Sequence, residues 1–288
     1  MRSKLFVPAS RPELFTKALA SAADAISFDL EDAVLPDRKA YAREQLGLLL
    51  DEPAAARSGK TLIVRVNAMD TSHFVDDLRV ACRAGIDIIN IPKIESRDDL
   101  LAGIAQLEQI EPGVRAAGQP PVKVLANIES PAALLNAAQI AGAHERVWGL
   151  QLGLGDLFEP LDIARYDAPN VHAVMFALRM AAAASGRVVL DSAYADVTNA
   201  QGFREEALLA RRVGFLGKTC IHPSQVALAN DVFSPTEQEL AWARKIIDAE
   251  ARNGGNGAYL LDGKMIDAPF VQRARLIVAR AGQQAAGH

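Results

Sequence analysis

The sequence predicts a (β/α)₈ barrel followed by a short C-terminal extension. Short β-branched runs alternate eight times with amphipathic helical stretches, polar residues follow most of the runs, and 288 residues suit one barrel with an appendage. Strands that alternate with helices pair in parallel through right-handed crossovers, and eight such units can close on themselves. A doubly wound open sheet is the alternative, because periodicity does not distinguish the two. The strand count and the polar strand ends favour the barrel.

The predicted strands are short and apolar, and each precedes a helical stretch. The first helix should begin near Pro12 and place Leu14, Phe15 and Ala18 on one stripe, the spacing that a helix needs to cover a sheet. The stretch His172–Ala184 is the most alanine-rich helix. In chain order, the predicted strands are Lys4–Pro8, Ala25–Leu30, Leu62–Val66, Ile86–Pro92, Val122–Ile128, Val147–Leu152, Val188–Asp191 and Phe215–Ile221.

Glycine and asparagine mark the predicted domain boundary. The barrel domain is expected to span residues 1–252, with its last helix beginning near Pro235. The run Asn253–Gly257 predicts a flexible hinge. Residues 253–288 should then form a C-terminal extension with a terminal helix from about Pro269, serving as a lid or an oligomer arm.

Composition excludes several classes of function. Half of the residues are hydrophobic and 6% are aromatic, as expected for helices on an aliphatic parallel sheet. A net charge of −4 without a Lys/Arg block argues against nucleic-acid binding. Cys82 and Cys220 lie far apart and predict neither a disulfide framework nor a zinc site. No secretory signal or membrane span is predicted, so we expect a cytoplasmic protein that does not bind membranes.

Polar and charged residues follow seven of the eight predicted strands. In a barrel these strand ends converge on one rim, which is where such enzymes place their active sites. Residues two apart on a strand share a face, so Asp29 and Glu31 can point the same way. The full set is Asp29, Glu31, Asp32, Arg65, Asn67, Lys93, Asn127, Glu129, Asp156, Asp191 and His222.

The carboxylates in this set indicate a metal ion. Six of them against Arg65 and Lys93 must be paired, protonated or bound to a cation. The candidate ligands are mostly oxygens, so Mg²⁺ or Mn²⁺ is expected rather than Zn²⁺. We predict Glu129 and Asp156 as the ligands, because they follow adjacent strands. Glu129 alone is explained equally well as an acid at a helix start, before Ser130.

Other residues carry weaker signals. Arg65 ends an apolar strand and needs a partner for its guanidinium, which favours function. The run Gly153–Asp156 (Gly-Leu-Gly-Asp) predicts a tight loop whose backbone N–H groups can approach an anion. His222 is interpreted as a structural strand-end residue, and Asp267 as the N-cap of the last helix. Motifs for a serine nucleophile, a phosphate loop or a dinucleotide site are missing from the sequence.

Seven sets of motifs are spread along nearly the whole chain: residues 2–8 (RSKLFVP) with 10–12 (SRP), 28–34 (FDLEDAV) with Lys39 and Arg43, 65–67 (RVN), 91–93 (IPK), 127–130 (NIES), 214–218 (GFLGK) with 221–223 (IHP), and 262–267 (DGKMID). Together these motifs resemble the citrate lyase β-subunit-like branch of the HpcH/HpaI aldolase superfamily, which includes malyl-CoA and citramalyl-CoA lyases. One departure matters: the family often has Gly-Ala-Glu-Asp where this chain has Gly153–Asp156, so substrate preference can differ.

The resemblance implies a (β/α)₈ barrel that forms a homotrimer or a hexamer of trimers. It implies that Glu129 and Asp156 hold Mg²⁺ and that Glu31 and Asp32 hold metal-bound waters. The run that contains Gly155 is expected to contact substrate.

The resemblance also implies roles around the substrate. Phe6 and Arg11 are expected to shape the ligand pocket, and Arg65 is expected to contact the reacting carbonyl. Asp267 matches a C-terminal acid that the family supplies across a subunit boundary, and this match favours a functional role for Asp267 over the N-cap explanation.

The expected reaction is the reversible Claisen cleavage of a 3-hydroxyacyl-CoA of the malyl-, citramalyl- or citryl-CoA type. The products are an acyl-CoA and a 2-oxo acid, with Arg65 stabilising the developing oxyanion and Asp267 transferring the proton. Two alternatives are a malyl-CoA-type thioesterase and a citrate lyase β subunit that acts on an acyl carrier protein partner.

Overall fold

The structure is a computed structural model that describes residues 1–52, 59–115, 118–254 and 257–285. It divides into two compact units, Met1–Phe233 and Ser234–His288. The sequence placed this boundary one helix later, after residue 252. Helix α12 (Glu237–Asn253) groups with the C-terminal tail because its buried residues Ala243 and Ile246 share an apolar cluster with Ile266.

The first unit contains a closed parallel barrel of eight strands within the described residues, so the predicted fold is confirmed and the open sheet is wrong. β8 closes the barrel by pairing in parallel with β1, with Ser3 opposite Lys218 and Leu5 opposite Cys220. The strands are β1 (Ser3–Pro8), β2 (Ala25–Asp29), β3 (Thr61–Arg65), β4 (Ile88–Ile91), β5 (Lys123–Ile128), β6 (Val147–Leu152), β7 (Val188–Asp191) and β8 (Gly217–Cys220).

The predicted strands agree with these bounds to within two residues. β6 and β7 match their predicted limits, whereas β8 starts two residues after the predicted Phe215. The cause is the end of the preceding helix: Gly214 adopts a left-handed conformation (φ 95°), and the Phe215 N–H still donates to Ala210 O at 3.0 Å. Phe215 therefore belongs to a helix C-cap.

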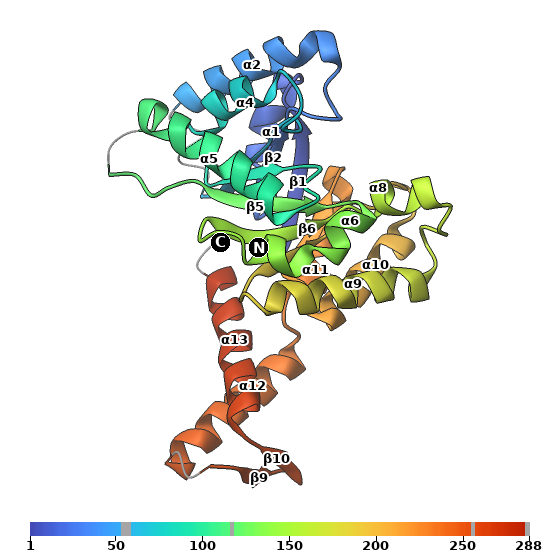
Figure 1. The fold of residues 1–288 in the computed structure, drawn as a ribbon. Coiled ribbons are helices and arrows are strands. Elements are labelled where there is room, and N and C mark those ends of the chain that lie inside the picture. Colours follow the sequence, from blue (N-terminus) through green and yellow to red (C-terminus); the bar gives the residue numbers. More distant parts are fainter. Residues whose placement is uncertain (53–58, 116–117, 255–256, 286–288) are drawn as a thin grey trace. The chain divides into compact units, whose positions relative to one another are not determined.

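Helices surround the strands in Figure 1 and follow each strand in the chain. The first helical segment is short, because η1 (Pro12–Leu14) precedes an α1 of only five residues, Phe15–Leu19; Phe15 and Ala18 are buried as predicted. The other helices of this unit are η2 (Pro36–Arg38), α2 (Lys39–Asp51), α4 (Phe74–Ala81), α5 (Arg97–Val114), α6 (Pro131–Leu135), α7 (Ala137–Ala141), α8 (Leu154–Phe158), η3 (Glu159–Leu161), α9 (Ala168–Ala183), α10 (Ala200–Val213) and α11 (Pro223–Phe233).

The inside of the barrel changes from apolar to polar along the strands. Near the strand starts, an apolar cluster that includes Ala25, Ile63 and Ile88 fills the interior. One layer higher, Lys4 of β1 donates to Asn90 of β4 and to Gln151 of β6. Bonds between non-neighbouring strands must cross the barrel interior, so a hydrogen-bonded polar layer lies beneath the C-terminal strand ends.

The second unit pairs two helices and a hairpin. α12 begins with a capping box, in which the Thr236 hydroxyl accepts from Glu239 N and the Glu239 carboxylate accepts from Thr236 N. β9 (Tyr259–Leu261) and β10 (Lys264–Ile266) pair antiparallel and lead into α13 (Ala268–Ala285). Of the predicted hinge Asn253–Gly257, residues 255–256 lie outside the described residues.

None of the described helices combines the length and apolarity needed to cross a membrane.

Candidate active site

An arginine and an aspartate form a two-pronged ion pair at the C-terminal rim of the barrel. Asp29 and Arg65 are opposite each other in the register of β2 and β3. Arg65 Nε and Nη2 donate to the two Asp29 oxygens at 2.8 and 2.7 Å. Burial opposes ionisation of Asp29, but the charge and hydrogen bonds of Arg65, together with the backbone N–H groups of Glu31 and Ala33, outweigh it and hold the pKa of this carboxyl below its usual value. The two-pronged pair therefore fixes the guanidinium in place.

Glu31 adds a second buried acid next to this pair. Its carboxylate lies 2.9 Å from Arg65 Nη1 and 3.3 Å from Lys93 Nζ. Neither of its oxygens has a hydrogen-bond partner among the described residues. Burial raises the pKa of Glu31 to about 7, and the neighbouring carboxylates Asp32 and Glu129 add to this rise, although Arg65 opposes it. We call Asp29, Glu31, Asp32, Arg65 and Lys93 the Arg65 cluster.

Glu129 lies just after β5 with its carboxylate held from two sides. Oε1 accepts from Lys93 N at 2.6 Å, and Oε2 accepts from Asn127 Nδ2 at 3.0 Å. Lys93 adopts a left-handed φ of 54°, an uncommon conformation for this residue type. The N-cap of α6 is Ser130, whose hydroxyl accepts from Ala133 N. The helix-start explanation of Glu129 is therefore wrong, because its carboxylate binds groups outside that helix.

The negative charge of Asp156 acts on the carboxyl group of Glu129. Burial raises the pKa of the Glu129 carboxyl, the negative charge of Asp156 adds to the rise, and Arg65 opposes it. Asp156 is exposed in the first turn of α8, whereas Glu129 is buried. Glu129, Asp156 and Arg65 are thus electrostatically coupled at one rim.

The glycines before Asp156 have different environments. A Cβ on Gly153 would lie 2.6 Å from Glu129 Cβ and 3.0 Å from Glu129 Oε2, so only glycine fits there. A Cβ on Gly155 would meet open space. The predicted tight loop is instead the start of a helix, because Gly153 is the N-cap of α8 and Gly155 lies in its first turn.

Phe6 lies between two cations. Its ring centroid is 4.2 Å from Lys4 Nζ and 4.8 Å from Arg65 Cζ. Lys4 is fully buried, and burial lowers its pKa well below the usual value. Lys4 was not among the predicted site residues, although it is a basic residue on an apolar strand, as Arg65 is.

Several predicted residues have partners of their own. Asp191 forms a fully buried ion pair with Lys218 at 2.6 Å, so of the three options for the rim carboxylates it takes pairing and not a metal ion. Arg11 is exposed and pairs with Glu13. His222 is exposed and contacts Ser224, in line with a structural role.

Asp267 belongs to the second unit and immediately precedes α13. Its Oδ1 atom is buried and has no hydrogen-bond partner in the described part of the chain. Such a carboxylate oxygen is available to a ligand or a partner chain.

The residues at the rim fit a divalent cation with oxygen ligands. Glu129 and Asp156 have no ion-pair partner within the described ranges, and the buried Glu31 oxygens lack hydrogen bonds. Among the described residues, no group of three or more His, Cys, Asp or Glu side chains is arranged to hold a metal ion without further ligands. Mg²⁺ is held by one or two carboxylates together with water or substrate, so this sparse set suits Mg²⁺ better than Zn²⁺.

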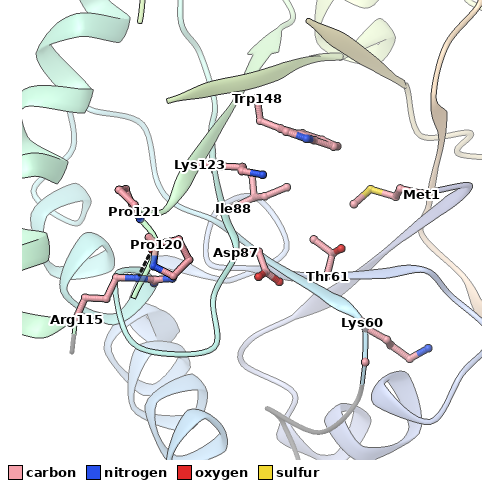
Figure 2. Close-up of a pocket in the computed structure, with 11 residues that line it drawn as sticks. Met1, Lys60, Thr61, Asp87, Ile88, Arg115, Pro120, Pro121, Lys123 and Trp148 are labelled. Atoms are coloured by element: carbon pink, nitrogen blue, oxygen red, sulfur yellow. Dashed lines mark hydrogen bonds between the residues drawn. The ribbon is translucent and has the colours of Figure 1, made fainter. Parts of the chain in front are cut away.

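A cavity of about 400 Å³ lies at the opposite, N-terminal end of the barrel, as Figure 2 shows. It is lined near the strand starts by Thr61, Ile88, Lys123 and Trp148. None of the rim residues described above lines it. In a parallel barrel the chemistry belongs to the C-terminal strand ends, so we assign the candidate active site to the rim.

Comparison with known proteins agrees with this architecture. The chain is 38% identical over 286 residues to citrate lyase subunit beta of Haemophilus influenzae, covering 97% of this chain and 96% of that protein. It is also 38% identical over 283 residues to (3S)-malyl-CoA thioesterase of Cereibacter sphaeroides, covering 97% and 94%. The structure of protein CitE of Mycobacterium tuberculosis with magnesium, acetoacetate and coenzyme A superposes with a TM-score of 0.75 at 32% identity, covering 98% of this chain and all of that chain.

Residues 2–223 match the family model for HpcH/HpaI aldolase/citrate lyase, and this range includes every barrel strand. The match and the relatives make the protein an enzyme of the group that acts on CoA thioesters and oxo acids. The chain belongs to the HpcH/HpaI aldolase/citrate lyase family, in its citrate lyase β-subunit-like branch.

Proposed function

We propose that the protein is a Mg²⁺-dependent carbon–carbon lyase. Its reaction is the reversible cleavage of a 3-hydroxyacyl-CoA of the malyl-, citramalyl- or citryl-CoA type to an acyl-CoA and a 2-oxo acid. The observation that carries the proposal is the packing at the C-terminal rim: Gly153, the N-cap of the helix that carries Asp156, lies against Glu129, and Asp29 fixes Arg65 at a nearby strand end. Two carboxylates without an ion-pair partner in the described residues and a fixed guanidinium suit a substrate that carries both a chelating oxygen pair and a reacting carbonyl.

In this proposal Glu129 and Asp156 hold the cation, and Glu31 and Asp32 hold its water ligands. When bound, Mg²⁺ would lower the pKa of the substrate hydroxyl and neutralise the neighbouring carboxylate. The magnesium in the structure of the mycobacterial relative supports a magnesium-dependent reaction. Glu129 is held as an acceptor by Lys93 N and Asn127 Nδ2, which leaves its other lone pairs for a cation.

Arg65 stabilises the negative charge that develops on the thioester oxygen. As the C–C bond breaks, its electron pair moves into the thioester to form an enolate. The substrate hydroxyl gives its proton to water, and its oxygen becomes the carbonyl oxygen of the 2-oxo acid. Asp29 already fixes Nε and Nη2 of Arg65, so the guanidinium needs no reorganisation when this charge appears. Phe6, stacked against Arg65, forms an adjoining wall of the pocket.

Asp267 transfers the remaining proton. It protonates the enolate carbon to give the acyl-CoA, and it removes that proton in the condensation direction. The buried, unpartnered Oδ1 of Asp267 supports a role outside its own unit. In this proposal Asp267 reaches the rim of a neighbouring subunit, so the active form is a homotrimer or a hexamer of trimers.

Two other activities use the same rim. The malyl-CoA thioesterase relative favours hydrolysis of the thioester, and the citrate lyase subunit beta relative favours action on an acyl group carried by a protein partner. Product analysis separates them, since cleavage alone releases a 2-oxo acid. Inactivity on free CoA esters that an acyl carrier protein restores would identify the subunit function.

The test is a panel of malyl-, citramalyl- and citryl-CoA, with glyoxylate, pyruvate and oxaloacetate measured as products. The wild type should release one oxo acid only when Mg²⁺ is present, and Glu129→Ala should abolish this release. Glu145→Ala, which removes an exposed acid just before the start of β6, at the end of that strand away from the rim, should retain full activity. Full activity of Glu129→Ala, or equal activity in a metal chelator, would overturn the proposal.

Asp267→Ala gives a separate test of the proton role. It should retain binding of Mg²⁺ and of the oxo acid while turnover is lost. An equal loss of oxo-acid binding contradicts a role limited to proton transfer.

A further inference from the structure

We infer that Ser192 is a positioning residue that holds the turn carrying Asp156. The inference rests on the proposed function, in which Asp156 binds the metal ion. Ser192 follows β7, and its Oγ accepts from Leu154 N at 3.0 Å. Leu154 opens α8, and Asp156 lies two residues later in the same turn. Both Leu154 and Ser192 are buried, with 0% and 3% of their surfaces exposed.

This hydrogen bond gives an acceptor to a backbone N–H group at the start of the short helix α8. The first N–H groups of a helix have no acceptor within the helix. The Gly153 N-cap has no side chain to supply one, and Ser192 supplies it from another strand end. Within the described residues, no hydrogen bond or ion pair holds the Asp156 carboxylate itself. The direction of this carboxylate therefore depends on the backbone of α8.

Ser192 is itself fixed by a buried set of four charged residues, which we call the Lys218 cluster: Arg165, Asp191, Glu206 and Lys218. Lys218 Nζ donates to Ser192 O at 3.1 Å and to Asp191 Oδ2 at 2.6 Å. The other Asp191 oxygen accepts from Ser192 N at 2.7 Å. Ser192 is thus held at its N–H and its carbonyl, and its hydroxyl is left to face Leu154.

The rest of the cluster closes around these contacts. Glu206 accepts from Lys218 Nζ at 2.9 Å and from Arg165 Nη1 at 2.7 Å. Arg165 Nη2 also donates to Ala193 O, the next carbonyl along the chain from Ser192. Two cations and two carboxylates are mutually paired away from solvent. The first two residues of the β7–α10 connection, Ser192 and Ala193, are therefore held by this buried cluster.

The experiment compares two buried serines of the barrel. Ser192→Ala removes the acceptor for Leu154 N–H, whereas Ser27→Ala removes a buried hydroxyl that has no partner in the described structure. The dissociation constant of Mg²⁺ is measured calorimetrically without substrate, at a temperature where circular dichroism shows each variant folded. Ser192→Ala should weaken Mg²⁺ binding by about 10-fold or more, the usual cost of losing an outer-shell contact, while Ser27→Ala leaves it unchanged. Ser192→Thr, which keeps the hydroxyl, should recover much of the affinity.

Other outcomes are decisive in the opposite direction. Mg²⁺ binding by Ser192→Ala within twofold of the wild type, or an equal weakening by Ser27→Ala, overturns the positioning role. If the wild type binds Mg²⁺ and Asp156→Asn weakens that binding, such a result leaves the proposed function standing. If the wild type binds no Mg²⁺, or Asp156→Asn binds as tightly, both the proposed function and the role of Ser192 fail.

Discussion

The barrel holds two buried charged clusters that follow different rules. In the Lys218 cluster, two cations and two carboxylates pair with one another within 3.2 Å. In the Arg65 cluster, three carboxylates share Arg65 and Lys93, and Glu129 and Asp156 stand beside them without a cation in the described part of the chain. Both clusters lie near C-terminal strand ends, so position does not distinguish them. The two clusters differ in charge balance, because carboxylates outnumber cations around Arg65. A bound metal ion would balance this excess.

The pKa values of the two clusters differ by less than their pairing does. In the Lys218 cluster, Asp191 and Glu206 outweigh the cost of burial and raise the pKa of Lys218, while burial raises the pKa of Asp191 to about 6. In the Arg65 cluster, burial and the neighbouring carboxylates raise the pKa of Glu31 to about 7, although two cations lie nearby. The carboxylates of the Lys218 cluster therefore have cations of their own, whereas Glu31 takes up a proton near neutral pH when no metal ion is bound.

The largest expected effect is a loss of stability when the Lys218 cluster is changed. Lys218→Met leaves Asp191 and Glu206 buried without their shared ammonium group. Removing one partner of a buried ion pair costs about 3–5 kcal/mol. The free energy of unfolding from urea titration should fall by that amount. A loss below about 1 kcal/mol would show that this cluster is not a structural base.

The next effect concerns turnover. Arg65→Lys keeps the charge but cannot reproduce the two-pronged contact with Asp29. We expect kcat to fall about 10²–10³-fold, the usual cost of losing an oxyanion donor. The unfolding free energy should fall less than in Lys218→Met. If Arg65→Lys loses stability but keeps its kcat, the Arg65 cluster has a structural role like that of the Lys218 cluster.

A smaller effect depends on pH. The usual pKa of a glutamate is 4.5, and in the folded protein that of Glu31 is about 7, so the folded state binds this proton more tightly than the unfolded state does. The stability that Glu31 contributes is present below pH 4.5 and is lost as the pH rises through 7. Without metal, the free energy of unfolding of Glu31→Gln should therefore rise relative to that of the wild type by about 2–3 kcal/mol between pH 5 and pH 8.

Urea unfolding in a chelator at both pH values measures this gain. Glu145→Gln, at an exposed acid, should show no such trend. A constant difference between Glu31→Gln and the wild type across the range contradicts the raised pKa.

The smallest effect tests the close contact beside Glu129. Gly153→Ala places a methyl group 2.6 Å from Glu129 Cβ, so one of the two must move. Overpacking of this kind costs about 1–3 kcal/mol of stability, and Mg²⁺ binding should weaken with it. Gly155→Ala is the matched control, because its methyl group meets open space two residues away. Calorimetry and urea unfolding of the pair measure both effects, and equal behaviour of the two variants contradicts the steric argument.

The fold was predictable because periodicity and the residues at strand ends report on the same barrel. Arg65 and Glu129 stood out from the sequence, since a charge beside an apolar strand needs a partner. The sequence left open which rim carboxylate is paired, because the partner of Asp191, Lys218, lies 27 residues away on a strand whose inward face the sequence did not reveal. The boundary at Phe233 was missed for a related reason: the buried face of α12 looks the same whether it packs on a barrel or on α13.

The two glycines of the Gly153–Asp156 run differ in how freely they can be substituted. Any side chain at residue 153 would collide with Glu129, so the backbone that leads to Asp156 can approach Glu129 this closely only through a glycine. A side chain at residue 155 would meet open space, so residue 155 can be redesigned without displacing Glu129.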